Sequence, residues 1–228
     1  MLPWLFFISI GVLVGVAIYV GYYLKKKRRQ ELALAAKQLG LEFSLVDTLG
    51  VIGYPFALFQ KGDGRGCENV MWGTWQGLPL REFDYWYYEE STDSEGHTSR
   101  SYYRFSCVTT DIEAVCPHLT IERENLFTRM ADHLGFRDIE FETEEFNKAF
   151  NVKSKDRKFA NDLIDSRMMQ WLQQAGEDWA YEVIGSQMLC FSKRRKPVEL
   201  LPLLGTAKAF REHVPRVVYE LYGSGAHQ

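Results

Sequence analysis

The chain has 228 residues, of which 46% are hydrophobic and 25% are charged, and its formal net charge is −3 at pH 7. Setting aside the five consecutive bases at residues 25–29 leaves 22 Lys and Arg against 30 Asp and Glu, a net charge of about −8. Nucleic-acid binding uses basic patches, so this acidic composition argues against DNA or RNA as a partner. No linker rich in Pro, Ser or Gly divides the chain, so we expect a single domain over residues 40–222.

The first 24 residues form an apolar segment. No charged side chain occurs from Leu2 to Leu24, and about 20 apolar residues in a helix span a hydrocarbon core of roughly 30 Å. Trp4 near one end and three tyrosines near the other fit the aromatic belts of a membrane helix. A cleaved signal peptide would have a basic segment before a shorter apolar core, and a small-residue cleavage site after it. We therefore predict a retained transmembrane helix over residues 1–24.

Five bases follow the apolar segment at once: Lys25, Lys26, Lys27, Arg28 and Arg29. Bases beside a span stay on the cytoplasmic side, which predicts a single-pass protein of the cell membrane, its N-terminus outside and its C-terminal domain cytoplasmic. We interpret the bases chiefly as this topology signal, although they could also attract anionic lipid headgroups. Gly11 and Gly15 have the spacing of membrane helices that associate, so self-association and a plain lipid-facing helix both remain open.

Residues 25–39 are expected to form the basic juxtamembrane collar and a helix leaving the membrane. Leu32, Ala35, Ala36 and Leu39 recur at helical spacing, and Gly40 should end the helix. Strands are expected at 41–46, 55–60 and 70–75. The polar KGDGRG sequence at 61–66 is interpreted as a hairpin turn joining the last two. Its glycines suggest a phosphate loop, but no GK[ST] follows them.

Residues 78–88 and 101–109 give the strongest strand signals, because they are rich in aromatic and β-branched residues. Alternation places Phe83, Tyr85 and Tyr87 on one face of the first strand. We expect these strands to form a hairpin with a long, mobile, acidic loop over residues 89–101.

This hairpin carries a dense group of aromatic side chains. Platforms that stack single-stranded nucleic acid look similar but have basic grooves, whereas the neighbours here include Glu82, Asp84, Glu89 and Glu90. Cross-strand packing within a sheet is therefore the preferred interpretation. The outward part remains a candidate surface for a protein or ligand. Its candidate residues are Tyr85, Tyr87, Tyr102 and Tyr103.

The rest of the chain alternates between short strands and helices. In order, we predict a strand at 119–122, a helix at 124–134, a strand at 139–142, helices at 156–164 and 167–175, a hairpin of strands 179–184 and 187–192 around Gly185-Ser186, a helix at 198–222 split or kinked by Pro215, and a flexible tail at 223–228. Strands in runs, with helices between and after them, predict an α+β fold: one N-terminal transmembrane helix, then a soluble domain with an antiparallel sheet and packed helices.

The residues that could carry chemistry are better explained as structural. Four widely spaced cysteines, with no CxxC, are expected to be reduced and buried in a cytoplasmic domain; a reversed topology would allow two disulfides. A metal set of Cys107, Cys116, His118 and His133 matches no usual zinc spacing. A run of carboxylates is interpreted as a solvated face, at Glu140, Glu142, Glu144 and Glu145. No hydrolase, metalloprotease or kinase motif occurs, so we expect no metal, cofactor or catalytic residue.

Residues 141–172 carry a pattern typical of a known family. It reads FETEEFNKAFNV over 141–152, then Lys155-Asp156-x-x-Phe159-Ala160 and Asp165-x-x-Met168-Met169-x-Trp171-Leu172. This pattern resembles bacterial, mostly actinobacterial, single-pass membrane-anchored proteins of unknown function, and is similar to domain-of-unknown-function family 3137. The resemblance covers residues 136–195 well and 70–135 loosely. It implies a membrane tether and an α+β domain, with no catalytic residues to carry over.

Three functions are compatible with these features. The first is a non-enzymatic membrane-tethered module for protein interaction or scaffolding at the cytoplasmic face. The second is a sensor of a small molecule or lipid, with a pocket under the aromatic hairpin. The third is an enzyme of unrecognised type, which would need a cleft with convergent polar groups. The expected partners are the lipid bilayer, a further membrane or cytoplasmic protein, and a second copy of the chain.

Overall fold

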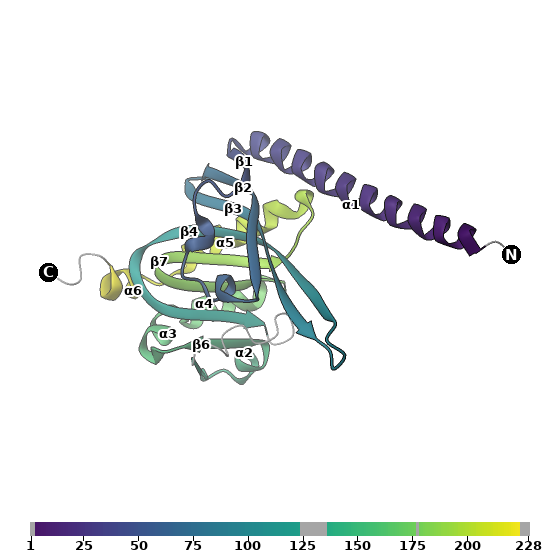
Figure 1. Cartoon of the computed structure of the whole chain (residues 1–228). Helices are drawn as coiled ribbons and strands as arrows, with labels where there is room; N and C mark the ends of the chain where they lie inside the picture. The colour runs from purple at the N-terminus through teal and green to yellow at the C-terminus, as the bar shows by residue number, and fades with distance from the viewer. Residues whose placement is uncertain (1–2, 124–135, 177, 224–228) are drawn as a thin grey trace.

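A single long helix opens the structure. In this computed structural model, which describes residues 3–123, 136–176 and 178–223, α1 (Pro3–Leu39) is 37 residues long. Its N-terminal part projects away from the rest of the molecule (Figure 1). Among the described residues it is the one helix long and apolar enough to cross a membrane. The predicted transmembrane and juxtamembrane helices are therefore one continuous element. It ends as predicted at Gly40, whose φ of 71° suits glycine.

Within the described ranges, seven strands form one antiparallel sheet. They are β1 (Glu42–Val46), β2 (Gly64–Trp75), β3 (Leu78–Thr92), β4 (Thr98–Arg123), β5 (Arg137–Asp138), β6 (Phe150–Ser154) and β7 (Ala180–Lys193). Strand β4, 26 residues long, is the organising element. Its first half pairs with β3 and its end pairs with β6, while β7 pairs along both halves. The antiparallel sheet with packed helices confirms the predicted α+β fold.

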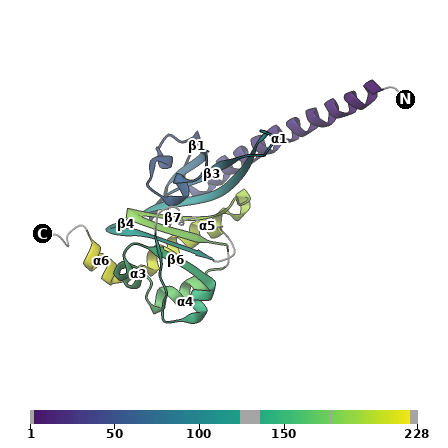
Figure 2. The ribbon, with the colours of Figure 1, turned by 60° about the horizontal axis from the view of Figure 1, so that its bottom comes forward.

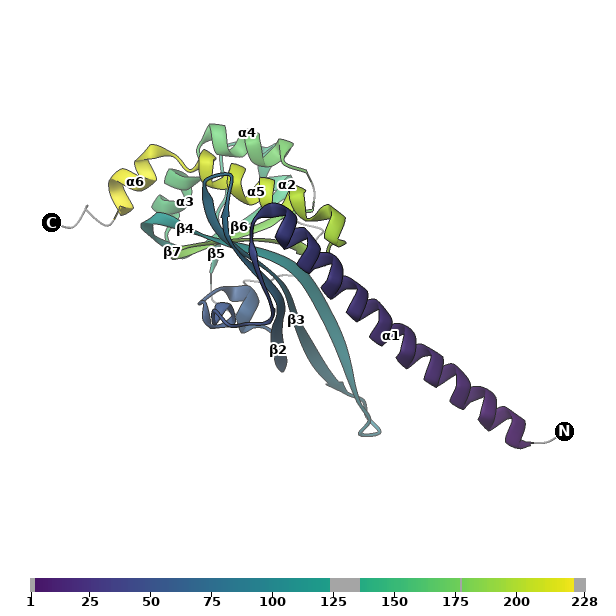
Figure 3. The ribbon, with the colours of Figure 1, turned by 90° about the horizontal axis from the view of Figure 1, so that it is seen from above.

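The two faces of the sheet carry separate hydrophobic cores. Helices cover one face: α2 (Glu144–Ala149), α3 (Arg157–Leu163), α4 (Ser166–Gln174), α5 (Leu200–His213), α6 (Arg216–Tyr222) and the end of α1. Two short 3₁₀ turns, η1 (Val51–Gly53) and η2 (Ala57–Gln60), pack with aromatic side chains on the other face. Figures 2 and 3 show this arrangement, with the sheet between the helices and the 3₁₀ turns.

Several predicted elements are correct in type and place. The helices at 156–164 and 167–175 correspond to α3 and α4, and each begins with an aspartate whose side chain accepts from a backbone N–H. Pro215 splits the last predicted helix into α5 and α6, after a short turn, η4 (Pro197–Glu199). The helix predicted at 124–134 lies outside the described residues, as does most of the tail.

The strand predicted at 55–60 is wrong. Ala57, Leu58 and Phe59 are buried one after another, which a half-buried strand does not allow. The carboxylate of Glu182 accepts from the N–H groups of Ala57 and Leu58 and so holds this segment as the turn η2. The hairpin predicted around 61–66 is wrong as well, because its first strand does not form and because β2, which begins at Gly64, pairs with β1 and β3.

The hairpin predicted around Gly185-Ser186 is also wrong, since β7 runs unbroken from Ala180 to Lys193. Gly185 has a φ of 57°, but it lies opposite Cys116 where the register against β4 shifts. Its conformation serves a bulge rather than a turn. The strands predicted at 101–109 and 119–122 are likewise one strand, β4.

The strand predicted at 139–142 does not form, because the backbone N–H and carbonyl of Phe141 bond to a side chain and not to a neighbouring strand. Asn147 accepts from the Phe141 N–H at 2.9 Å and donates to the Phe141 carbonyl at 2.7 Å. The short strand β5 lies just before this segment, and β6, which was not predicted, follows it. The four carboxylates of this region are exposed, as predicted for a solvated face.

The mobile loop predicted over 89–101 is mostly sheet. Residues 89–92 pair with 98–101 in continuous register, from Glu89 opposite Ser101 to Thr92 opposite Thr98. The Asp93 side chain closes the tip by accepting from the N–H groups of Glu95 and His97. The hairpin of β3 and β4 therefore projects from the domain as an ordered arm, on the same side as the N-terminal part of α1 (Figure 3).

Candidate functional site

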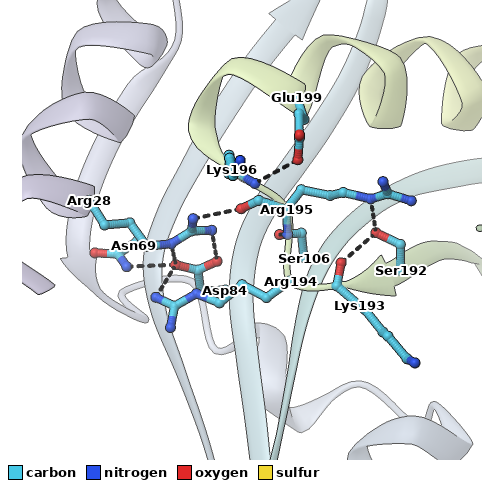
Figure 4. A network of polar contacts seen from close by, with 10 residues as sticks. All are labelled: Arg28, Asn69, Asp84, Ser106, Ser192, Lys193, Arg194, Arg195, Lys196 and Glu199. Atoms are coloured by element: carbon cyan, nitrogen blue, oxygen red, sulfur yellow. Dashed lines mark hydrogen bonds and ion pairs between the residues drawn. The ribbon is translucent and has the colours of Figure 1, made fainter. Parts of the chain in front are cut away.

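The junction between α1 and the domain is built around one buried ion pair. Arg28 donates from Nε to Asp84 Oδ2 at 2.7 Å and from Nη2 to Asp84 Oδ1 at 2.5 Å. The Arg28 side chain is 13% exposed and that of Asp84 is 3% exposed. Such two-point contacts between a guanidinium and a carboxylate fix direction as well as distance. α1 is therefore held to β3 in one orientation (Figure 4).

Two further groups complete the surroundings of Asp84. Asn69 donates from Nδ2 to Asp84 Oδ2 at 2.8 Å, and Arg194 approaches the same oxygen at 3.2 Å. Asn69 has a φ of 57° and lies where the register between β2 and β3 shifts. A bulge of this kind redirects a side chain. Here it aims the amide of Asn69 at the carboxylate.

The turn after β7 also contacts α1. Arg28 donates from Nη1 to the carbonyl oxygen of Arg195 at 2.6 Å. That turn is itself held in place, because the Arg195 N–H donates to Ser106 Oγ at 3.0 Å and the Lys196 N–H donates to Glu199 Oε2 at 3.0 Å. A single arginine of α1 thus joins β3 and the turn after β7 (Figure 4).

A second carboxylate lies beside this network. Glu82 precedes Asp84 by two residues, faces the same side of β3 and is fully buried. Neither of its carboxylate oxygens has a hydrogen-bond partner among the described residues. Burial raises the pKa of Glu82 well above its usual range; the charge of Asp84 raises it further and that of Arg28 opposes this. The junction therefore pairs one carboxylate, while burial favours the protonated form of its neighbour.

Three of the other bases of the collar approach carboxylates. Lys25 lies 2.8 Å from Glu68, and Arg29 lies 3.5 Å from the same carboxylate. Lys27 instead approaches Glu31 of its own helix at 3.8 Å. Three of the five bases thus contact the domain. The collar therefore has a structural role in addition to the topology signal predicted for it.

The four predicted surface tyrosines do not form one surface. Tyr85 and Tyr87 are 1% and 5% exposed and belong to the core on the η2 side. Tyr85 donates its hydroxyl to the Leu58 carbonyl at 3.1 Å. Tyr103 stacks on Tyr87 at 4.9 Å between ring centroids, while Tyr102 lies on the opposite face of the hairpin. Burial thus excludes Tyr85 and Tyr87 from any contact surface.

The accessible aromatic face consists of Trp86, Tyr88 and Tyr102, and the glycines of β2 make room for it. Trp86 and Tyr88 stack at 6.4 Å between centroids, and Tyr88 lies 5.4 Å from Tyr102. A Cβ added at Gly64 would lie 2.4 Å from the Tyr88 ring, and one at Gly66 would lie 2.5 Å from the Trp86 ring. The glycine-rich sequence is thus a cradle for aromatic rings. Asp84 shares this face of β3, so the aromatic face lies on the side of the sheet that meets α1.

The residues considered for a metal site do not come together. Cys107 belongs to the core on the η2 side and Cys116 to the core on the helical side. No cluster of metal ligands occurs among the described residues, and His133 lies outside them. The four cysteines are free thiols, three of them buried. His118 contacts Glu182 at 2.5 Å, and that carboxylate also holds the backbone of η2, so this pair has a structural role.

The sequence indicated that buried carboxylates lie on β3, but it did not indicate which cation pairs with them. Alternation along β3 places Leu78, Leu80, Glu82 and Asp84 on one face, so two carboxylates continue an apolar row. Buried carboxylates require cations or protonation. The cation that meets Asp84 is 56 residues away in the chain, and no local pattern connects the two.

Comparisons with known proteins support the fold. No family model matches the chain, and no curated protein matches it in sequence; the resemblance to family 3137 gains no support from them. A crystal structure of the mycobacterial trehalose monomycolate transport factor A, TtfA, superposes with a TM-score of 0.58. The match covers 81% of this chain and 93% of that chain at 13% identity. The fold is shared with TtfA.

The likeness to TtfA, a mycobacterial protein, agrees with the α+β architecture that the predicted resemblance implied. At 13% identity it concerns the fold alone. The helix α1 adds an apolar segment suited to membrane anchoring. The orientation of the domain relative to the membrane stays a prediction, which rests on the basic collar.

Proposed function

We propose that this protein is a membrane-anchored, non-catalytic factor that assists lipid transport at the cell membrane, with its domain held rigidly to its anchor on the cytoplasmic side. The observation that carries the proposal is the buried Arg28–Asp84 pair, which extends the rigid domain into the base of α1. A flexible tether would bring the domain to the membrane without fixing its orientation. A fixed orientation is useful when a particular surface must meet the bilayer or a protein within it.

Two observations support contact at the membrane. The ordered hairpin projects on the same side as the N-terminal part of α1 (Figure 3). Its accessible aromatic face carries Arg100 over Tyr88 at 4.7 Å and Arg104 over Tyr102 at 5.2 Å. Aromatic rings and bases together are typical of membrane interfaces. The other face of the hairpin is filled by packed side chains, which gives no support to a sensor pocket beneath it.

The lipid-transport part of the proposal is suggested by TtfA, which is a transport factor for trehalose monomycolate. We test it by depleting this protein from its native cells and following labelled envelope lipids. We expect one lipid class to accumulate at the inner membrane and to decrease outside it. An unchanged distribution of every lipid class would contradict the proposal.

The rigid connection is tested by complementing the depleted cells with an insertion. Two alanines between Leu24 and Lys25 rotate the membrane helix by about 200° against the domain. The matched control places the same two alanines between Leu2 and Pro3, where the phase of the junction is unchanged. We expect the first variant to fail in complementation and the second to succeed. Equal complementation would show that α1 acts as a simple tether.

A further inference from the structure

A cavity of about 450 Å³ lies between α1 and β1, at the level where the apolar segment ends. Tyr22, Lys26, Arg29 and Ala33 of α1 form one wall. Their spacing places them on one face of the helix. The neighbouring face, with Arg28, Leu32 and Ala36, packs against the domain. The cavity therefore lies beside the face of α1 that packs against the domain, and it exists because the two are packed together.

The opposite wall is apolar. Phe43 and Leu45 point to the same side of β1, since they are two residues apart. Leu45 is 47% exposed, so the cavity opens to its surroundings along this strand. An apolar surface that is left open where a membrane helix enters its domain fits the start of an acyl chain better than it fits water.

The rim of the cavity is basic. Lys25, Lys26 and Arg29 line it, and Glu68 is the acidic partner that Lys25 and Arg29 share. Lys26 forms no ion pair with any residue in the described part of the chain. The Nε of Arg29 is buried and also has no partner there. The rim therefore keeps a net positive charge and donors suited to an anionic oxygen.

We propose that this cavity binds one anionic phospholipid of the bilayer that surrounds α1. Its phosphate lies between Lys26 and Arg29, and the first part of an acyl chain lies against Tyr22 and Leu45. The position of the cavity along α1 favours a phospholipid as its occupant. Apolar residues 7–24 precede the cavity and the basic collar lines it, so the cavity meets the headgroup layer. The inference rests on the proposed membrane anchoring but adds a defined lipid site to it.

The experiment uses the full chain in vesicles of phosphatidylcholine containing a fraction of photoreactive phosphatidylglycerol. Crosslinking to the segment around Phe43 and Leu45 is measured by mass spectrometry. Replacing the probe with photoreactive phosphatidylcholine tests charge preference. We expect the anionic probe to label this segment several times more strongly. Equal labelling by both lipids would overturn the proposal.

Two pairs of neighbouring substitutions locate the site. Lys26→Gln should lower labelling about fivefold, the effect of losing one base at an anionic surface. Its control, Lys27→Gln, removes the same charge from a residue outside the cavity lining, and should retain labelling. Ala33→Trp should fill the cavity and abolish labelling, whereas Leu34→Trp, at a neighbouring position that is 57% exposed, should not. Equal effects within each pair would show general attraction to the membrane and overturn the defined site.

Two further outcomes separate the possible failures. If millimolar inorganic phosphate displaces the lipid probe, the site recognises a small anion and the phospholipid assignment is overturned. If the protein is extracted from membranes by alkaline carbonate, the proposed anchoring fails as well. If it stays integrated and complements the depleted cells but shows no preference for the anionic probe, the lipid site alone is wrong.

Discussion

Strand β3 carries two carboxylates that pair with arginines, Asp84 near its middle and Glu90 near its C-terminal end, and the two pairs differ in burial. At the base of the hairpin, Arg28 and Asp84 meet at 2.5 Å, with 13% and 3% of their side chains exposed. Towards the tip, Arg100 and Glu90 meet at 2.7 Å, with 54% and 37% exposed. Chemistry and distance are nearly the same. What differs is whether water can solvate a charge when its partner is removed.

That difference divides the hairpin into a fixed base and a replaceable tip. The buried pair cannot lose one member without leaving a charge inside the protein. The exposed pair can lose either member, because water takes its place. The base is therefore suited to holding α1, and the outer face is suited to contacts that change without cost to the fold.

The largest effect is expected from Arg28→Met, which leaves Asp84 buried without its main cation. We expect a loss of about 3–5 kcal/mol in the free energy of unfolding, the usual cost of breaking a buried pair. Urea denaturation of the full chain in detergent micelles measures it. The control is Lys27→Met, which removes an exposed base. Replacing both partners, as Arg28→Met with Asp84→Leu, should recover most of the loss. A loss as small as that of the control would mean that the buried pair does not hold the junction.

A smaller effect is expected from Gly66→Ala. The added Cβ would lie 2.5 Å from the Trp86 ring, so the ring or the strand must move, at about 1–3 kcal/mol. Near-ultraviolet circular dichroism should report the change in the aromatic face, and denaturation its cost. Gly53→Ala is the control, because no atom lies within 4 Å of its Cβ position. If both variants behave alike, the glycine cradle does not position the aromatic face.

The pH dependence of the junction is tested by Glu82→Gln. The raised pKa of Glu82 means that the folded state keeps a proton that the unfolded state releases. Stability from this group is therefore fully present below the unfolded pKa, near 4.3 for glutamate, and is lost as pH rises through the folded pKa. The wild-type thermal midpoint should fall between pH 5 and pH 8 by more than that of the variant. Parallel midpoints across this range would show that Glu82 does not titrate with folding.

These residues also show how far the sequence could predict the structure. The α+β fold and the inward faces of β3 and β4 follow from alternation, which depends on neighbouring residues alone. The ends of the hairpin do not, because residues 89–92 and 98–101 are polar and are ordered by pairing with each other. Their sequence is that of a loop. Only the register of the partner strand makes them a ladder.

The candidate site needed information that no local pattern contains. The pairing of Arg28 with Asp84 joins a helix base to a strand 56 residues away. The side chain of Asn147 bonds to the backbone of Phe141, in the place that a neighbouring strand would take. The glycines of β2 leave space for the aromatic rings of β3. Each of these is a long-range or side-chain contact. Composition and spacing therefore predicted the long apolar N-terminal helix and the class of fold, and did not predict how the two are joined.

The smallest effect is expected at the tip of the hairpin. Arg100 contacts Glu90 at 2.7 Å, a distance similar to those of the Arg28–Asp84 pair. It also lies over the Tyr88 ring, 4.7 Å from the ring centroid. Water surrounds both charges, so Arg100→Ala should leave the thermal midpoint of the full chain within measurement error. The crosslinking of the hairpin to membrane lipids should nevertheless decrease, because a base is lost from its aromatic face. A midpoint lowered as far as in Gly66→Ala would show that the tip is part of the rigid structure. The division of β3 into a fixed base and a replaceable tip would then be wrong.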